Sequence, residues 1–212
     1  MNVAVSTIVK DMHFYEPGKG HGLAHDPLTA IVAPRPIGWI TSINAKGEIN
    51  LAPYSYFNGV LSRPNLVMFS SEGFKDSVRN IRETEEFVCN LATWDLREAM
   101  NATSAPLPYG VNEMVRAGLE PAQSKLVKPP RVAAALCALE CKLTNIVQLK
   151  DIDGKELDGH VVIGRVIGVY IDDRYIRDGR VDTAAMKPIA RCGYLDEYAV
   201  VTELFRMTRP TA

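Results

Sequence analysis

Short runs of apolar and β-branched residues, separated by turn residues, dominate the chain from residue 28 onward. Short runs lie at 29–32, 37–43 and 66–70, and two longer runs span 136–149 and 161–171. Runs of this length and composition are typical of β-strands, because such side chains fit a pleated surface. We therefore expect a protein built mainly from strands.

Two turn sequences indicate how these strands connect. Residues 44–47, Asn-Ala-Lys-Gly, separate the run at 37–43 from a further run at 48–52. Glycine tolerates the positive φ angle that a tight hairpin requires, so Gly47 marks a hairpin turn. The polar, glycine-bearing residues 151–159 are expected to join the two long strands in the same way.

Three segments have a helical pattern instead. Residues 75–82 carry apolar side chains three apart on one face, and Asp76 or Ser77 can cap the start of this helix. Residues 96–102 and 111–117 have a similar pattern. Single helices among many strands predict a mainly β fold, an antiparallel barrel with inserted helices, rather than regular βαβ alternation.

Composition and length indicate one globular domain. The chain has 212 residues, of which 47% are hydrophobic and 23% charged, and a chain of this size fills a single core. Residues 1–27 are polar and are expected to form an N-terminal extension. Residues 28–212 are expected to form one domain.

Charge and cysteine content exclude several classes of partner. The 24 basic and 25 acidic residues leave a formal net charge of -1, so no global field attracts nucleic acid or an anionic membrane. No apolar run approaches the roughly 20 residues that span a bilayer, and the N-terminus does not have the layout of a secretory signal. The four cysteines form no CxxC pair. We expect a cytoplasmic protein.

The segment at 50–58, Asn-Leu-Ala-Pro-Tyr-Ser-Tyr-Phe-Asn, is the first candidate site. It mixes amide, hydroxyl and aromatic groups where an ordinary strand would alternate cleanly. Pro53 donates no ladder hydrogen bond, so the segment is expected to leave regular pairing near that residue. Free backbone N–H and C=O groups there would suit a flat heteroaromatic ligand.

The second candidate site is the segment at 70–77, which opens into the first predicted helix. A helix N-terminus offers unpaired N–H groups and partial positive charge, and Lys75 with the nearby serines adds a cation and hydroxyls. Together these groups suit a phosphate. On these residues alone, the alternative is that Asp76 and Ser77 cap the helix while Lys75 is solvated.

An ordered set of motifs connects these two segments to later ones. The motifs lie at 34–42, 50–55, 75–81, 159–166 and 191–210. Spanning about residues 25–210, the set resembles the flavin reductase-like family with the FMN-binding split barrel, a Greek-key antiparallel fold. The resemblance implies a homodimer with FMN near the subunit interface, and reduction of the flavin by NADH or NADPH.

The resemblance leaves three functions open. The first is an oxidoreductase, either an NAD(P)H-dependent flavin reductase or the reductase component of a two-component monooxygenase, with that monooxygenase as partner. The second is a flavoredoxin-like FMN electron-transfer protein reduced by a protein donor. The third is a non-catalytic module that binds flavin or another phosphoryl ligand.

The resemblance also implies which residues bind the cofactor. Carried over by motif, one group lines the isoalloxazine and ribityl chain, and a second group holds the phosphate. The first group comprises Trp39, Ile40, Thr41, Ser42, Asn50, Ala52, Pro53, Tyr54 and Ser55, and the second Ser70, Ser71, Lys75, Asp76, Ser77 and Asn80.

Histidines supply the remaining candidates. His160 is expected to open a strand and to contact a nicotinamide or substrate; a histidine satisfied by turn backbone is the alternative. Gly159 and Arg165 depart from the residues common at these positions in the family, and both positions bear on how a pyridine nucleotide would dock. His21 and His25 lie four apart, but the nearby glycines and Pro27 disfavour a helix, so we expect no metal site.

Overall fold

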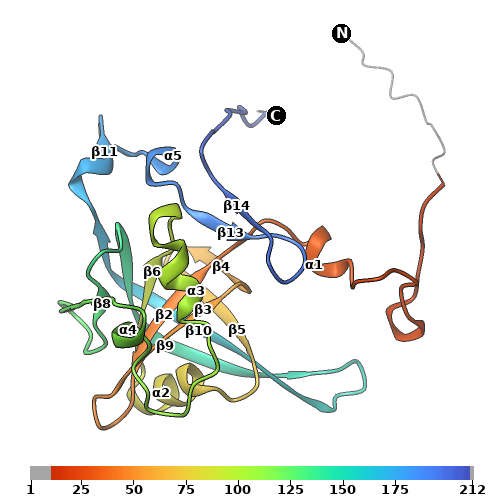
Figure 1. Cartoon of the computed structure of the whole chain (residues 1–212), viewed down its shortest axis with the longest axis horizontal. Helices are drawn as coiled ribbons and strands as arrows, with labels where there is room; N and C mark the ends of the chain where they lie inside the picture. The colour runs from red at the N-terminus through yellow and green to blue at the C-terminus, as the bar shows by residue number, and fades with distance from the viewer. Residues whose placement is uncertain (1–10, 211–212) are drawn as a thin grey trace.

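The computed structural model describes residues 11–210, in which an antiparallel sheet forms the body of the protein (Figure 1). Seven strands hydrogen-bond in one order, and every pair is antiparallel. The strands, in order across the sheet, are β3 (Ile49–Tyr54), β2 (Gly38–Ile43), β6 (Glu86–Leu91), β9 (Cys137–Lys150), β10 (Glu156–Ile171), β5 (Asn65–Glu72) and β4 (Phe57–Ser62).

The strand order explains the split barrel. β3 and β4 are consecutive in the chain, yet they lie at opposite edges of the sheet. The sheet therefore curls without closing, and each edge strand keeps one row of backbone groups outside the ladder. The mainly β antiparallel fold expected from the sequence is confirmed.

Two apolar cores lie on opposite faces of β2 and β3. Ile40 belongs to a core inside the barrel that also contains Phe69 and Ile81, whereas Trp39 and Leu51 belong to a core on the outer face. All six residues of β2 are consequently buried. Because both faces of β2 are buried, its sequence does not alternate between apolar and polar residues.

Helices and small sheets cover the ends of the barrel. In Figure 1, α2 lies against one end, and the β9–β10 hairpin projects away from the body. The helices are η1 (Pro17–Lys19), α1 (Leu28–Ile31), α2 (Asp76–Thr84), η2 (Trp94–Leu96), α3 (Arg97–Ala102), α4 (Glu113–Arg116), η3 (Asp173–Tyr175) and α5 (Thr183–Met186). The small sheets comprise β1 (Arg35–Pro36) with β13 (Ile189–Arg191) and β14 (Tyr198–Val200), β7 (Pro121–Ala122) with β8 (Arg131–Val132), and β11 (Ile176–Arg177) with β12 (Arg180–Val181).

The hairpin predicted at 44–47 is confirmed, since Gly47 has a φ of 83° and β2 pairs with β3 across it. The close approach at Gly38 was not expected. A Cβ atom on Gly38 would lie 2.6 Å from the ring of Phe57, so glycine is required where the ring of Phe57 packs against β2.

Several expected elements differ from those observed. Residues 29–31 belong to a helical turn, α1, and Val32 is its C-cap. Asp26 Oδ1 accepts the Leu28 N–H at 2.9 Å at the start of this turn. Strand propensity depends on pairing, which this run does not obtain. The predicted helix at 111–117 is shorter, and residues 156–159 of the predicted turn at 151–159 belong to β10 instead.

Two further expectations fail at the candidate sites. Neither Asp76 nor Ser77 caps α2, because Lys75 occupies the N-cap position and both residues lie in the first turn. Pro53 remains in register opposite Trp39. It is tolerated there because β3 is an edge strand, and the missing donor is not needed by a second neighbour.

Candidate functional site

A cavity of about 330 Å³ opens between β3 and the start of α2. We call it the β3–α2 groove. Its far wall is the loop at 103–107, together with the side chain of Glu113 from α4. The residues from the two predicted segments that line it are Asn50, Ala52, Pro53, Tyr54, Lys75, Asp76 and Ser77.

The start of α2 is the groove's most polar feature. No side chain among residues 11–210 caps this helix, so its first N–H groups lack a side-chain acceptor. Lys75 at the N-cap and Ser77 in the first turn both line the groove. A nine-residue helix with an uncapped N-terminus, a lysine and a hydroxyl has the groups that hold a phosphate.

A buried hydrogen bond orients the Ser77 hydroxyl. Asn50 Nδ2 donates to Ser77 Oγ at 2.9 Å. Since the amide occupies a lone pair of this oxygen, the hydroxyl proton of Ser77 is free to point at another acceptor. Asn50 in β3 thus orients the Ser77 hydroxyl of α2 so that it can donate a hydrogen bond.

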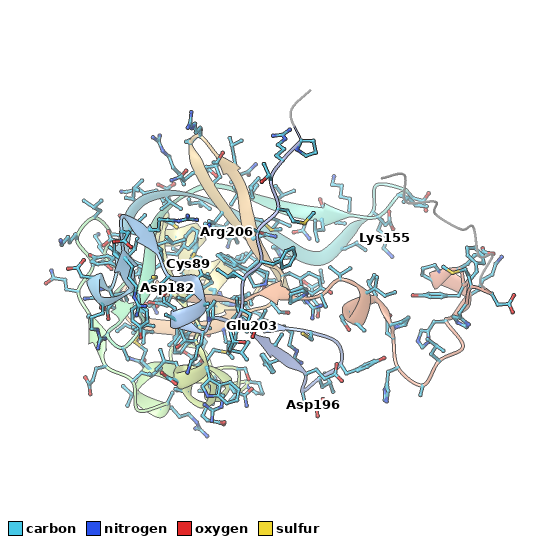
Figure 2. All side chains as sticks on the ribbon, turned by 90° about the horizontal axis from the view of Figure 1, so that it is seen from above. Cys89, Lys155, Asp182, Asp196, Glu203 and Arg206 are labelled. Carbon is cyan, nitrogen blue, oxygen red and sulfur yellow. The ribbon has the colours of Figure 1, made fainter. Side chains whose placement is uncertain are left out.

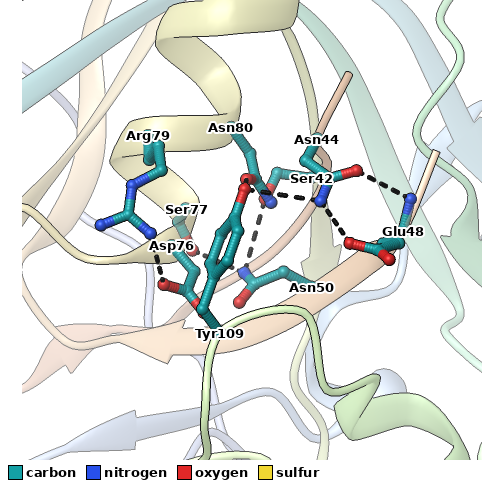
Figure 3. A network of polar contacts seen from close by, with 9 residues as sticks. All are labelled: Ser42, Asn44, Glu48, Asn50, Asp76, Ser77, Arg79, Asn80 and Tyr109. Carbon is teal, nitrogen blue, oxygen red and sulfur yellow. Dashed lines mark hydrogen bonds and ion pairs between the residues drawn. The ribbon is translucent and has the colours of Figure 1, made fainter. Parts of the chain in front are cut away.

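The same network continues behind the groove (Figure 3). Asn50 and Asn80 both donate to Ser42 Oγ, at 3.4 and 3.3 Å. Tyr109 donates to Asn80 Oδ1 at 3.4 Å and accepts from Asn44 Nδ2 at 3.4 Å. These bonds tie the hairpin, α2 and the loop before α4 into one unit.

Burial perturbs two acidic groups at the start of the groove. It raises the pKa of the Tyr54 phenol, while the neighbouring hydroxyls of Ser77 and Ser71 offset part of the rise. It also raises the pKa of the Asp76 carboxyl, an effect that Arg79 opposes. Arg79 Nη1 lies 3.6 Å from Asp76 Oδ1. Tyr54 is therefore a neutral hydrogen-bonding group at physiological pH.

Glu113 connects the groove to the free edge of the sheet. Its Oε2 accepts the backbone N–H of Leu51 at 2.9 Å, a donor that the sheet leaves unpaired because β3 is an edge strand. Burial raises the pKa of Glu113, and the hydrogen bond from Leu51 opposes this rise. The carboxylate thus stabilises β3 but adds negative charge to the groove.

Comparison with known proteins identifies the family at this point. Residues 32–183 match the flavin reductase-like domain. The chain belongs to the flavin reductase-like family. The resemblance inferred from the motifs at 34–42 and 50–55 is confirmed, since both lie within the matched range.

Solved structures of the same fold support this assignment. Nitrilotriacetate monooxygenase component B from Bacillus cereus is 30% identical, with 93% of this chain and 100% of that chain covered and a TM-score of 0.85. The 2-nitrobenzoate 2-nitroreductase of Pseudomonas fluorescens is 31% identical, with coverage of 87% and 89% and a TM-score of 0.77. A split-barrel protein from Shewanella frigidimarina, at 24% identity, covers 94% of this chain and 100% of that chain with a TM-score of 0.81, which shows the shared fold.

Three residues that the resemblance carried to the flavin lie behind the groove in this family member. The side chains of Trp39, Ile40 and Thr41 are fully buried. Trp39 Nε1 donates to Thr103 Oγ1 at 2.9 Å, so it anchors the loop that forms the far wall. Their backbone is paired between β3 and β6, and their contact with a flavin stays a prediction.

Three of the serines that the resemblance carried to the cofactor do not line the groove, namely Ser55, Ser70 and Ser71. Ser71 is buried, and its hydroxyl donates to Gly73 O at 3.0 Å. The Ser70 N–H donates to Tyr56 O at 2.8 Å. Ser55 follows β3 and lines a different cavity. Of the serines predicted to hold phosphate, only Ser77 lines the groove.

His160 lies inside the barrel rather than at the start of a strand. It is paired opposite Ser71, and its ring packs edge-on against Phe74 with centroids 5.3 Å apart. Nδ1 is buried without a hydrogen-bond partner among the described residues. His160 does not line the β3–α2 groove, so its contact with a nicotinamide or substrate stays a prediction.

The N-terminal histidines lie apart from the groove. His13 Nε2 is 2.7 Å from the carbonyl of His21, and the His25 ring packs on Tyr194 at 5.4 Å. Between residues 11 and 210, no group of three or more His, Cys, Asp or Glu side chains is arranged to hold a metal. No helix in that range is long and apolar enough to cross a membrane.

Several groove residues have no signal in the sequence. The loop at 103–107 contains Pro106, which breaks regular structure, yet the loop forms a wall of the cavity. Glu113 has the pattern of a helical surface residue, and its role depends on the edge of β3 lying opposite. The roles of this loop and of Glu113 depend on contacts between segments that are distant in sequence.

Proposed function

We propose that the protein is a flavin-dependent oxidoreductase that binds FMN in the β3–α2 groove. The uncapped start of α2, with Lys75 and Ser77 on the groove wall, carries this proposal. FMN ends in a phosphate monoester, and these groups match it. Membership of the flavin reductase-like family supports the flavin as the rest of the ligand.

The residues present fit the whole cofactor. Lys75 supplies a cation, and the Ser77 hydroxyl, oriented by Asn50, donates toward the phosphate. Ala52, Pro53 and Tyr54 line the groove along β3, where an edge strand offers backbone groups to a flat ring. The bound flavin supplies the redox chemistry, and the protein supplies orientation and control of access.

We further propose that NADH or NADPH is the electron donor and that the acceptor is a second enzyme. The similarity to a component B of a monooxygenase supports a reductase that serves a partner. All four cysteines have free thiols, which fits the reducing cytoplasm that we propose as its compartment.

A homodimer is the proposed assembly. The segment after β14 exposes large apolar side chains, with Leu204 65%, Phe205 86% and Met207 83% exposed. Such side chains in a row favour burial against another chain. Light scattering after size exclusion should give twice the 23.4 kDa of the chain, and a monomeric mass would contradict the proposal.

The deciding experiment is the visible absorbance spectrum of the purified protein, before and after NADH is added without oxygen. A flavin spectrum that bleaches is expected. A flavin spectrum that persists would favour a flavoredoxin-like protein with a protein donor. If added FMN does not bind at all, the proposed function is wrong.

A further inference from the structure

A second cavity, of about 890 Å³, begins where β3 ends. Tyr54 lines the β3–α2 groove, whereas the next residue, Ser55, lines this cavity, and the two spaces share no lining residue. Its walls come from the segment before β1 and from the loop between β13 and β14. We call it the arginine cavity, after Arg35 and Arg191 in its wall.

The two arginines are direct neighbours across a strand pair. Arg35 in β1 is the register partner of Arg191 in β13. Like charges placed directly opposite each other in a sheet destabilise the pair. Such a placement calls for a compensating negative charge.

Among residues 11–210, both guanidinium groups donate hydrogen bonds only to neutral acceptors. Arg35 donates to the carbonyls of Thr29 at 2.6 Å, Cys192 at 2.8 Å and Val32. Arg35 is only 7% exposed, and its Nε has no hydrogen-bond partner among residues 11–210. A guanidinium has five N–H donors, so Arg35 keeps two of them free.

Arg191 has the same kind of surroundings. It donates to Tyr198 Oη at 2.5 Å, to the Tyr194 carbonyl at 3.1 Å and to the Leu195 carbonyl. These three bonds also leave two of its donors free. Neither arginine therefore has a charged partner in its hydrogen bonds.

The carboxylates in the cavity wall do not neutralise these charges. Asp26 accepts the Leu28 N–H at the start of α1, and Asp196 lies at the outer end of the loop between β13 and β14 (Figure 2). Within the described part of the chain, no ion pair involves Arg35 or Arg191. Since a buried cation without a counter-charge is costly, an anion in the cavity would stabilise the pair.

Aromatic rings supply the remaining wall. The Arg35 guanidinium lies 5.6 Å from the centroid of the Tyr56 ring, and the rings of His25 and Tyr194 pack at 5.4 Å. A flat molecule that carries an acid group matches rings beside two planar guanidiniums. We propose that the arginine cavity binds the carboxylate of a flat organic acid.

This assignment goes beyond the proposed function and does not depend on it. Binding of the acid itself requires only Arg35, Arg191 and the aromatic walls. It can therefore be measured on the purified full chain without turnover.

Calorimetric titration with benzoate tests the proposal, with benzamide as the uncharged control of the same shape and inorganic pyrophosphate as a second anion. Benzoate should bind at least about 10-fold more tightly than benzamide, because hydrogen bonds to charged groups discriminate by that much or more. Arg191→Gln should weaken benzoate binding by about 10-fold. Arg180→Gln, an exposed arginine of β12, should leave it unchanged.

Arg191→Lys keeps the charge and should retain part of the affinity, which guards against a folding defect in the glutamine variant. Equal binding of benzoate and benzamide, or equal effects of Arg191→Gln and Arg180→Gln, would overturn the proposal. Tighter binding of pyrophosphate than benzoate would overturn the carboxylate assignment. If benzoate binds as expected while FMN does not, the flavin function fails and the acid site stands.

Discussion

The β3–α2 groove and the arginine cavity are two proposed sites for negative groups, and they are built in different ways. The proposed phosphate site in the groove consists of backbone N–H groups at the start of α2, with Lys75 and Ser77 two residues apart in sequence. The cavity relies on Arg35 and Arg191, which lie near opposite ends of the chain and meet only through the β1–β13 pair. A local segment thus makes the first site, and tertiary structure makes the second.

The difference predicts separate mutational effects, of which the largest should be in the groove. The double variant Lys75→Ala/Ser77→Ala should raise the Kd for FMN by about 100-fold, because each change removes a charge-assisted contact to phosphate. Fluorescence titration of FMN would measure this. Arg191→Gln is the matched control and should leave the Kd for FMN unchanged. An equal loss of FMN affinity in both variants would mean that the groove and the arginine cavity form a single FMN site.

A smaller effect is expected from Asn50→Ala. Asn50 holds the Ser77 hydroxyl through a buried 2.9 Å hydrogen bond, so its loss should raise the Kd for FMN by about 10-fold and destabilise the fold by about 1–2 kcal/mol. The same variant in a Ser77→Ala background should cost little more. If the two losses in FMN affinity add fully, Asn50 does not act through Ser77.

His160→Ala should separate cofactor binding from electron donation. His160 lies outside the groove and packs on Phe74, so the Kd for FMN should change little, while reduction by NADH or NADPH slows. Stopped-flow bleaching of the bound flavin measures the second quantity. Equal losses in both would mean that His160 shapes the flavin site instead.

The smallest effect should come from Glu113→Gln. The raised pKa of Glu113 means that the folded protein favours the protonated carboxyl, so this stabilisation is present at low pH and is lost as the pH rises through the raised value. The glutamine still accepts the Leu51 N–H, and the variant should therefore lose less stability than the native protein as the pH rises. Melting curves across acid and neutral pH would show this.

Removal of the negative charge should also tighten FMN binding by about 2-fold, since Glu113 lies on the groove wall and acts at a screened distance. Weaker FMN binding in Glu113→Gln would show that the carboxylate is a ligand contact. The same substitution should leave benzoate binding to the arginine cavity unchanged.

Local patterns in the sequence predicted much of the fold. The hairpin at 44–47 follows from the positive φ of Gly47. The long strand at 136–149 matches β9 closely, and the one at 161–171 matches the later part of β10. The run at 29–32 was misread as a strand. Its residues have the composition of one, but no neighbouring strand pairs with them, and pairing rather than composition decides the conformation.

The residues of the candidate site show the same difference between local signals and tertiary contacts. Lys75, Ser77 and Asn50 were recognised because helix starts and strand ends have local signatures, and the structure brings all three to one groove. Trp39 was expected on the flavin, but it is fully buried. A motif shows that a residue matters without showing whether it contacts the ligand or holds the residue that does.

The sequence by itself therefore determined the mainly β architecture, the hairpin and the helix start that suits a phosphate, because each depends on interactions among neighbours in the chain. Only the tertiary structure decided that Glu113 completes the edge of β3 and that Arg35 lies opposite Arg191. Those contacts join segments far apart in sequence. Their register is set by the packing of the whole sheet, which no local pattern records.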